Sequence, residues 1–217
     1  MDPKGVLLDE LVKHAYLWRP NDPFKLASGK TSPEYFDCKL ALSQPAAMAA
    51  LGRLILDRLD PEVTAIGGLT MGADPIAMSA CIASAHTKRS VRWFAVRKEA
   101  KVHGQRKLIE GDVRRGECVA IVDDVVTSGK STVQALDACL GDEFRLKVAQ
   151  VIVLVDREES NGIDNLRAAA AKAAGRPVPV EAVFRKSDIV AEWQSRQQAE
   201  TSAGTRSTRF VHACAHD

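Results

Sequence analysis

VAIVDDVVTSGKST, residues 119–132, is the most informative stretch of the chain. Its apolar start runs directly into two adjacent carboxylates, Asp123 and Asp124, and a hydroxyl-rich turn follows them. A short apolar run without polar alternation is typical of a strand that is covered on both faces, as in a parallel sheet. Functional groups gather beyond the carboxyl ends of such strands, so the two acids are predicted to lie at a site.

Apolar runs and helical patterns alternate outward from this stretch in both directions. The patterns predict strands at residues 63–68, 91–96, 118–122, 148–155 and 179–184, and helices at residues 3–18, 44–59, 73–85, 131–140 and 163–175. Ser43 is the expected N-cap of the second helix. This order predicts an α/β fold with a largely parallel central sheet flanked by helices. Sites are then expected just after residues 68, 96, 122 and 155.

Composition narrows the class of protein. The 217 residues are enough for one domain, and the formal net charge of +2 gives no reason to expect a nucleic-acid partner. Five scattered cysteines without a CxxC pair favour a reducing compartment, and no apolar stretch is long enough to span a membrane. We therefore expect a cytoplasmic protein without a membrane or nucleic-acid partner. The tail, residues 195–217, is polar and without a clear period, so we expect it to be loosely ordered.

The hydroxyl-rich turn is suited to binding a phosphate. The first N–H groups of the helix that follows lack intrahelical acceptors, and the hydroxyls of Thr127, Ser131 and Thr132 lie close to them in sequence. The carboxylates of Asp123 and Asp124 would repel the same phosphate, but they suit hydroxyl groups or a Mg²⁺ ion that the substrate's own phosphates also hold. A phosphorylated ribose offers both kinds of group.

Two other interpretations explain this stretch less well. Gly129, Lys130 and Ser131 fit the end of a P-loop, but that motif needs glycine at position 124, where this chain has Asp124. An acidic strand end followed by an ordinary helix N-cap is common, but it does not account for the whole string.

As a whole, VAIVDDVVTSGKST resembles the phosphoribosyl pyrophosphate (PRPP) motif of type I phosphoribosyltransferases. The resemblance implies the fold of that family, in which N-terminal and C-terminal segments form a small hood over the sheet. It implies that Asp123 and Asp124 are among the catalytic residues and contact the ribose 3′- and 2′-hydroxyls, and that the turn from Val126 to Thr132 holds the 5′-phosphate. The implied PRPP-binding residues of the turn are Val125, Val126, Thr127, Ser128, Gly129, Lys130 and Ser131.

A second stretch is rich in cations. Residues 97–107 contain Arg97, Lys98, Lys101, His103, Arg106 and Lys107, and on composition alone this is a solvated charged face. RKEAKVHG, residues 97–104, closely resembles the mobile catalytic loop of orotate phosphoribosyltransferases. The resemblance implies that the first four of these cations bind pyrophosphate oxygens, that Lys101 and His103 are catalytic, and that the loop is shared across a homodimer interface. Whether Lys101 or His103 donates the proton stays open.

Three further stretches resemble the same family. FKLASGKTSPEYFD, residues 24–37, is similar to its N-terminal substrate loop, which implies that Tyr35 and Phe36 lie beside orotate. GGLTMGADPIA, residues 67–77, looks like its pyrophosphate loop, where the residues would be Thr70, Met71 and Gly72. VLVDREE, residues 153–159, implies that Arg157, together with Thr127, binds orotate, since a guanidinium suits a planar carboxylate. Without the resemblance, the aromatic residues are core residues and Arg157 pairs with Glu158 or Glu159.

The resemblance implies a Mg²⁺-dependent transfer of the 5-phosphoribosyl group from PRPP to orotate, which gives orotidine 5′-monophosphate and pyrophosphate in pyrimidine biosynthesis. Magnesium would be held mainly through PRPP, with Asp124 as the candidate protein ligand. One domain, residues 1–194, is expected, with the hood at about residues 1–40 and 178–194. Two alternatives stay open: a phosphoribosyltransferase for another base, and a non-enzymatic regulator with the same fold.

Overall fold

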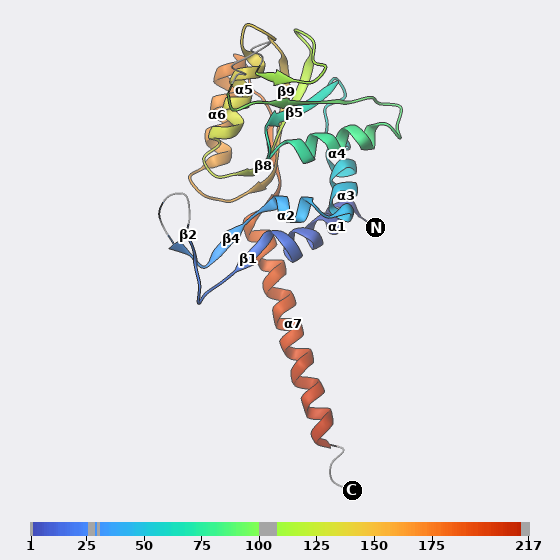
Figure 1. Cartoon of the computed structure of the whole chain (residues 1–217), viewed down its shortest axis with the longest axis vertical. Helices are drawn as coiled ribbons and strands as arrows, with labels where there is room; N and C mark the ends of the chain where they lie inside the picture. Colours follow the sequence, from blue (N-terminus) through green and yellow to red (C-terminus); the bar gives the residue numbers. More distant parts are fainter. Residues whose placement is uncertain (1, 26–28, 30, 100–107, 214–217) are drawn as a thin grey trace.

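The computed structural model of the chain describes residues 2–25, 29, 31–99 and 108–213, with side chains described as far as residue 202. Its centre is a six-stranded sheet in the order β10-β9-β8-β5-β6-β7 (Figure 1). The strands are β5 (Ala65–Leu69), β6 (Arg92–Val96), β7 (Ile109–Glu110), β8 (Cys118–Val126), β9 (Lys147–Asp156) and β10 (Val180–Arg185). All neighbours pair in parallel except β6 and β7, so the predicted largely parallel sheet is confirmed.

Helices cover both faces of the sheet, and the sheet separates two apolar cores. One core lies under α1 (Pro3–Glu10), α2 (Cys38–Leu42), α3 (Pro45–Leu56) and α4 (Asp74–Ser84), and the other lies under α5 (Lys130–Leu140) and α6 (Gly162–Ala174). Along β8, Ala120 and Val122 face the first core, whereas Val119 and Ile121 face the second. Successive side chains of a strand point to opposite faces, so burial on both faces requires the unbroken apolar runs seen in the sequence.

The N-terminal segment and the start of α7 (Lys186–Ala213) meet beside the sheet. The N-terminal segment contains the π-helix η1 (Leu11–Ala15), the antiparallel pair β1 (Tyr16–Trp18) and β4 (Glu34–Phe36), and the pair β2 (Phe24–Lys25) and β3 (Thr31–Ser32). It packs against the start of α7. The rings of Tyr16 and Trp193 lie 5.3 Å apart, and Arg196 Nη1 lies 2.6 Å from Asp9 Oδ1. Figure 1 shows the rest of α7 extending away from the body of the molecule.

Several predicted element boundaries were wrong. The helix expected over residues 3–18 is divided into α1, η1 and β1, because Tyr16 to Trp18 pair with β4. Ser43 ends the short helix α2, and Gln44 is the residue before α3, which begins at Pro45. Proline at the first helical position needs no N–H partner, so α3 starts there.

The C-terminal tail also differs from the expectation. Residues 195–213, expected to be loosely ordered, continue α7 as helix. Alanine, glutamine, glutamate and arginine are strong helix formers, so a helix can form here without an apolar stripe. Arg196 Nε also lies 2.9 Å from Glu192 Oε1, an i,i+4 pair that supports the helix.

Neither a disulfide nor a membrane span is found in the described part of the chain. Cys38, Cys81, Cys118 and Cys139 are free thiols, and burial raises the pKa of Cys139 to about 12. Among residues 2–25, 29, 31–99 and 108–213, no helix combines the length and the apolar character needed to cross a bilayer.

Candidate functional site

A cleft of about 510 Å³ opens where the carboxyl ends of the central strands meet; we call it the acidic cleft. It is lined by residues from the end of β5, from the loops after β5 and β6, from β8, from α2 and from α5: Lys39, Leu69, Thr70, Met71, Gly72, Lys98, Asp123, Asp124 and Ser131. A cavity therefore lies at the carboxyl edge of the sheet, where the sequence predicts a site. The strand predicted to end at residue 122 extends through Val126, so the two acids lie within β8.

Asp123 is held by donors close to it in sequence. Its Oδ2 accepts hydrogen bonds from Ser131 Oγ at 2.9 Å and Thr132 Oγ1 at 2.6 Å, and its Oδ1 accepts the Asp124 N–H at 3.0 Å. Burial, opposed by these hydroxyls and aided by the charge of Asp124, raises the pKa of Asp123 to about 6. The hydroxyls of Ser131 and Thr132, expected near a phosphate, are thus bound to Asp123.

Asp124 is held by groups from two other parts of the fold. Its Oδ1 accepts the Val125 N–H at 2.9 Å, and its Oδ2 lies 3.2 Å from Lys39 Nζ on α2. Gly72 packs directly against it, because a Cβ on Gly72 would lie only 2.5 Å from Asp124 Oδ1. Asp123 and Asp124 therefore face different partners although they are neighbours in sequence.

The segment after β5 forms one wall of the cleft. Its Thr70–Met71 peptide bond is cis, and Thr70 Oγ1 donates a hydrogen bond of 2.6 Å to Asp74 Oδ2 at the start of α4. The Thr70 N–H is bonded to the Val96 carbonyl of the neighbouring strand at 2.8 Å. The predicted trio Thr70, Met71 and Gly72 thus lies together against the acids, with Met71 largely exposed.

The hydroxyl-rich turn after β8 is braced by the loop after β9. Gly129 has the left-handed φ of 81° that favours glycine, and α5 begins at the next residue, Lys130. The Arg157 N–H donates to the Val126 carbonyl at 3.0 Å. A Cβ on Gly162 would lie 2.4 Å from the Thr127 carbonyl oxygen, so the two loops touch backbone to backbone.

The described part of the cationic stretch reaches the cleft at one residue. Lys98 lines the acidic cleft, and its carbonyl accepts a hydrogen bond of 2.8 Å from Gln134 Nε2. Arg97 does not line the cleft, and its Nη1 lies 3.5 Å from Glu110 Oε1. Lys101 and His103, the predicted catalytic residues, lie outside the described residues.

A second, small pocket lies between the N-terminal segment, the loop after β9 and the start of α7; we call it the terminal pocket. It is lined by Tyr16, Glu34, Tyr35, Phe36, Arg157 and Lys186, and so combines three of the four residues predicted to bind the base. The fourth, Thr127, lines neither the terminal pocket nor the acidic cleft. Phe36 is also part of the core, and the ring of Tyr35 stacks on Phe24 at 5.3 Å.

Arg157 has an incompletely used guanidinium. Its Nη2 lies 3.1 Å from Glu159 Oε1, the surface ion pair considered in the sequence, and its side chain is mostly buried. Its Nε is buried and has no hydrogen-bond partner among the residues that the structure describes. An unpaired buried donor on a cation costs free energy, which a bound anion would recover.

Sequence reasoning missed several residues that shape these two sites, among them Tyr16, Glu34, Lys39, Gly162 and Lys186. Lys186 Nζ forms an ion pair with Glu34, which also accepts a hydrogen bond of 3.3 Å from the Tyr16 hydroxyl. Burial and the charge of Glu34 raise the pKa of Tyr16 to about 12, so Tyr16 stays a hydroxyl donor. These contacts join segments far apart in the chain, and no local pattern signals them.

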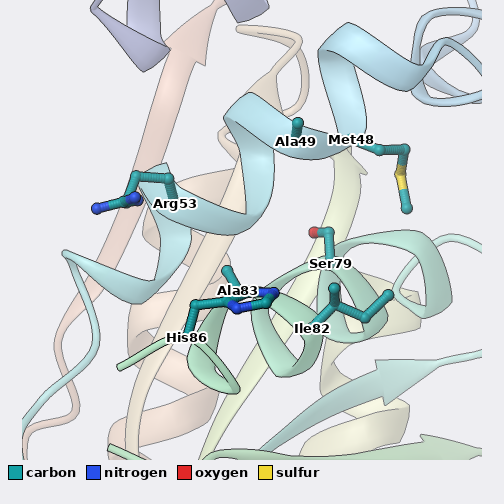
Figure 2. Close-up of a pocket in the computed structure, with 7 residues that line it drawn as sticks. All are labelled: Met48, Ala49, Arg53, Ser79, Ile82, Ala83 and His86. Carbon is teal, nitrogen blue, oxygen red and sulfur yellow. The ribbon is translucent and has the colours of Figure 1, made fainter. Parts of the chain in front are cut away.

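Another hollow, of about 450 Å³, lies between α3 and α4 (Figure 2). Its lining is mostly apolar: Met48, Ala49, Arg53, Ser79, Ile82, Ala83 and His86. None of the residues predicted to bind a substrate lines it, so the chemistry is assigned to the acidic cleft and the terminal pocket.

Comparisons with known proteins show which proteins the chain resembles. No family model matches the chain. The orotate phosphoribosyltransferase of Aquifex aeolicus is 36% identical over 187 residues, which cover 84% of this chain and 96% of that protein. A crystal structure of Mycobacterium tuberculosis orotate phosphoribosyltransferase with Fe(III) dicitrate is 30% identical, with a TM-score of 0.68 over 87% of this chain and 99% of that one. The same enzyme in complex with PRPP matches with a TM-score of 0.61 and 25% identity, over 86% and 91% of the two chains.

Proposed function

The chain belongs to the orotate phosphoribosyltransferase family, and we propose that it transfers the 5-phosphoribosyl group from PRPP to orotate, giving orotidine 5′-monophosphate and pyrophosphate in pyrimidine biosynthesis. The observation that carries the proposal is the position of Arg157. Arg157 lines a pocket with Tyr35 and Phe36, its buried Nε has no hydrogen-bond partner among the described residues, and its backbone N–H is bonded to the end of β8 after the acid pair. A planar ring with a carboxylate suits this combination of a guanidinium and aromatic side chains.

In this proposal the acidic cleft binds PRPP through two kinds of contact. Asp123 and Asp124 accept hydrogen bonds from the ribose 3′- and 2′-hydroxyls. The turn from Val126 to Thr132 holds the 5′-phosphate through its backbone N–H groups, at the positive end of the α5 dipole. Because Ser131 and Thr132 donate to Asp123, they tie the ribose contact to the phosphate turn.

The reaction breaks the bond between ribose C1 and pyrophosphate. Negative charge develops on the leaving pyrophosphate, while the sugar becomes electron-deficient. Donors and cations already placed around the leaving group stabilise that charge more in the transition state than in the ground state. We assign this role to Thr70, Met71 and Gly72, and to Arg97, Lys98, Lys101 and His103 from the catalytic loop, with Lys101 or His103 as the proton donor.

The same family membership supports Mg²⁺ as the cofactor. No cluster of three His, Cys, Asp or Glu side chains that could hold a metal exists among the described residues. Two neighbouring carboxylates next to a polyphosphate substrate do suit Mg²⁺, which keeps few protein ligands and takes the rest from phosphates. The ion would be held mainly by PRPP, with Asp124 as the protein ligand, and would supply neutralising charge on the diphosphate.

Three further assignments belong to the proposal. The protein is a homodimer with the catalytic loop shared across the interface. It works in the cytoplasm on small-molecule substrates, without a nucleic-acid or membrane partner. Residues 1–194 form one domain, with a hood from about residues 1–40 and 178–194 over the base, which the contacts of Tyr16 with Trp193 and Glu34 with Lys186 support.

The test is a panel of bases with PRPP, in the presence and absence of Mg²⁺. We expect consumption of orotate with release of pyrophosphate, dependence on Mg²⁺, and no turnover of uracil or purines, which lack the carboxylate that Arg157 would bind. Turnover of a purine but not of orotate would assign the protein to another base. Binding of PRPP without turnover of any base would favour a non-enzymatic regulator.

A further inference from the structure

Two lysines, Lys39 and Lys98, are among the described residues that line the acidic cleft. Of these two, Lys39 lies outside the motifs predicted from the sequence. It comes from α2, and its Nζ lies 3.2 Å from Asp124 Oδ2 and 3.5 Å from Asp37 Oδ1. Partial burial lowers the pKa of Lys39, but the charges of Asp124 and Asp37 outweigh this and raise it. Lys39 therefore carries its charge at neutral pH.

The contact fixes one of the two oxygens of Asp124. Oδ1 is occupied by the Val125 N–H at 2.9 Å and lies against Gly72, whereas Oδ2 has Lys39 as its partner. Without Lys39, the side chain of Asp124 loses the group that holds Oδ2 on the α2 side of the cleft. The orientation of Asp124 thus depends on α2, a segment 85 residues away in the chain.

Lys39 also changes the charge of the cleft. The described residues that line it include two acids, Asp123 and Asp124, and two lysines, Lys39 and Lys98. A polyanion must enter a space that already holds the carboxylates, and Lys39 lies directly on one of them. Removing it leaves Asp124 with an uncompensated charge facing the incoming phosphates, which disfavours binding.

We propose that Lys39 is a positioning residue, which holds the Asp124 carboxylate in place for the ribose hydroxyl and thereby sets the affinity of the cleft for PRPP. The inference rests on the proposed function, because it takes PRPP as the ligand of the cleft. It assigns to Lys39 no contact with the reacting atoms.

The test measures binding of PRPP and of ribose 5-phosphate by calorimetry in the presence of Mg²⁺. We expect Lys39→Met to weaken both ligands about tenfold, because both use Asp124, and Lys39→Arg to restore most of the affinity. The double variant Lys39→Met/Asp124→Asn should bind no more weakly than Asp124→Asn alone, since Lys39 acts through Asp124. In turnover, the loss should raise KM for PRPP more than it lowers kcat.

Lys13→Met is the matched control. The side chains of Lys13 and Lys39 are each 53% exposed, and Lys13 Nζ pairs with Asp9 at 2.6 Å, away from the cleft. This control should bind both ligands as the wild type does. If Lys39→Met lowers the thermal midpoint by more than the control does, Lys39→Gln, which keeps a polar head, serves as the second variant.

Three results would overturn the inference: wild-type affinity in Lys39→Met, a loss for PRPP but not for ribose 5-phosphate, or no recovery in Lys39→Arg. The second result would show a direct contact with the diphosphate instead. Failure of the proposed function looks different: a wild-type protein that binds PRPP but does not consume orotate refutes the base and leaves Lys39 in place. A wild-type protein that does not bind PRPP refutes both.

Discussion

The β8–α5 stretch and the terminal pocket are built in opposite ways. In the β8–α5 stretch, the hydroxyls that hold Asp123 come from residues 8 and 9 positions further along the chain. In the terminal pocket, Lys186 meets Glu34 across 152 positions, and Tyr16 meets Glu34 across 18. The β8–α5 stretch is a local motif on one strand and one helix. The terminal pocket forms only when the N-terminal segment packs against the start of α7.

Because the two regions are built differently, substitutions in them are expected to affect different substrates. Residues of the β8–α5 stretch are expected to control PRPP, because the ribose and phosphate contacts are assigned to that stretch. Residues of the terminal pocket are expected to control orotate. Arg157, on the loop between β9 and α6, and Gly162, the first residue of α6, both contact the end of β8 or the turn after it.

The largest expected effect is on orotate. Arg157→Ala should lower kcat/KM for orotate by about a hundredfold or more, because the carboxylate loses a charge-assisted pair in a mostly buried pocket. Arg157→Lys should recover only part, since a lysine cannot form a bidentate pair. Steady-state kinetics with orotate varied, together with calorimetry for PRPP, would check this.

Arg167→Ala is the control for Arg157. Arg167 also pairs with a nearby acid, Asp164 Oδ1 at 2.8 Å, but on the exposed face of α6. It should leave both substrates unaffected. If Arg157→Ala weakened the binding of PRPP as much as the binding of orotate, the assignment of one substrate to each region would be wrong.

A smaller effect is expected at the contact between the loops. Gly162→Ala would place a Cβ 2.4 Å from the Thr127 carbonyl oxygen, so the backbone of the phosphate turn must shift. We expect PRPP affinity to fall about tenfold, with a loss of about 1–3 kcal/mol in the free energy of unfolding. Calorimetry and denaturant unfolding measure the two effects.

Gly5→Ala in α1 is the comparison for Gly162. There the nearest atom to a new Cβ is Asp2 Oδ2 at 3.7 Å, an ordinary contact. It should leave PRPP binding unchanged and slightly stabilise the helix. Normal PRPP binding by Gly162→Ala would show that the brace does not position the phosphate turn.

The smallest effect concerns stability and its dependence on pH. Thr132→Val removes the 2.6 Å hydrogen bond to buried Asp123, whose pKa burial already raises to about 6, and so raises that pKa further. A carboxyl with a raised folded-state pKa contributes its stability below the unfolded pKa and loses it as pH rises through the folded pKa. The variant should therefore lose about 1–3 kcal/mol near pH 7 and less near pH 4.

Denaturant unfolding at the two pH values would check this, with Thr132→Ser as the control that keeps the hydroxyl. An equal loss at both pH values would show that Asp123 does not depend on Thr132 for its charge. It would then remove the local link between the ribose contact and the phosphate turn.

Much of the sheet could be predicted because burial on both faces demands apolar runs. Each run can be recognised in the sequence without knowledge of the other strands. The acid pair and the turn were equally legible, since their contacts are local. The length of β8 was underestimated, because Asp123 and Asp124 belong to the strand although they are polar. Their polarity indicated a site and suggested that the strand ended before them. Residues 16–18 were predicted as part of a helix, because the pairing of Tyr16 with Phe36 that makes them a strand is a long-range contact.

The α/β fold, the acids of β8, the turn after them and the position of Arg157 after a buried strand can all be recognised in the sequence, because local spacing and strand burial carry that information. The folded chain adds that Lys39 pairs with Asp124, that Gly162 touches the turn after β8, and that Glu34 and Lys186 line the pocket of Arg157. Ion pairs and backbone contacts depend on distance in space, and these contacts join segments that lie far apart in the sequence.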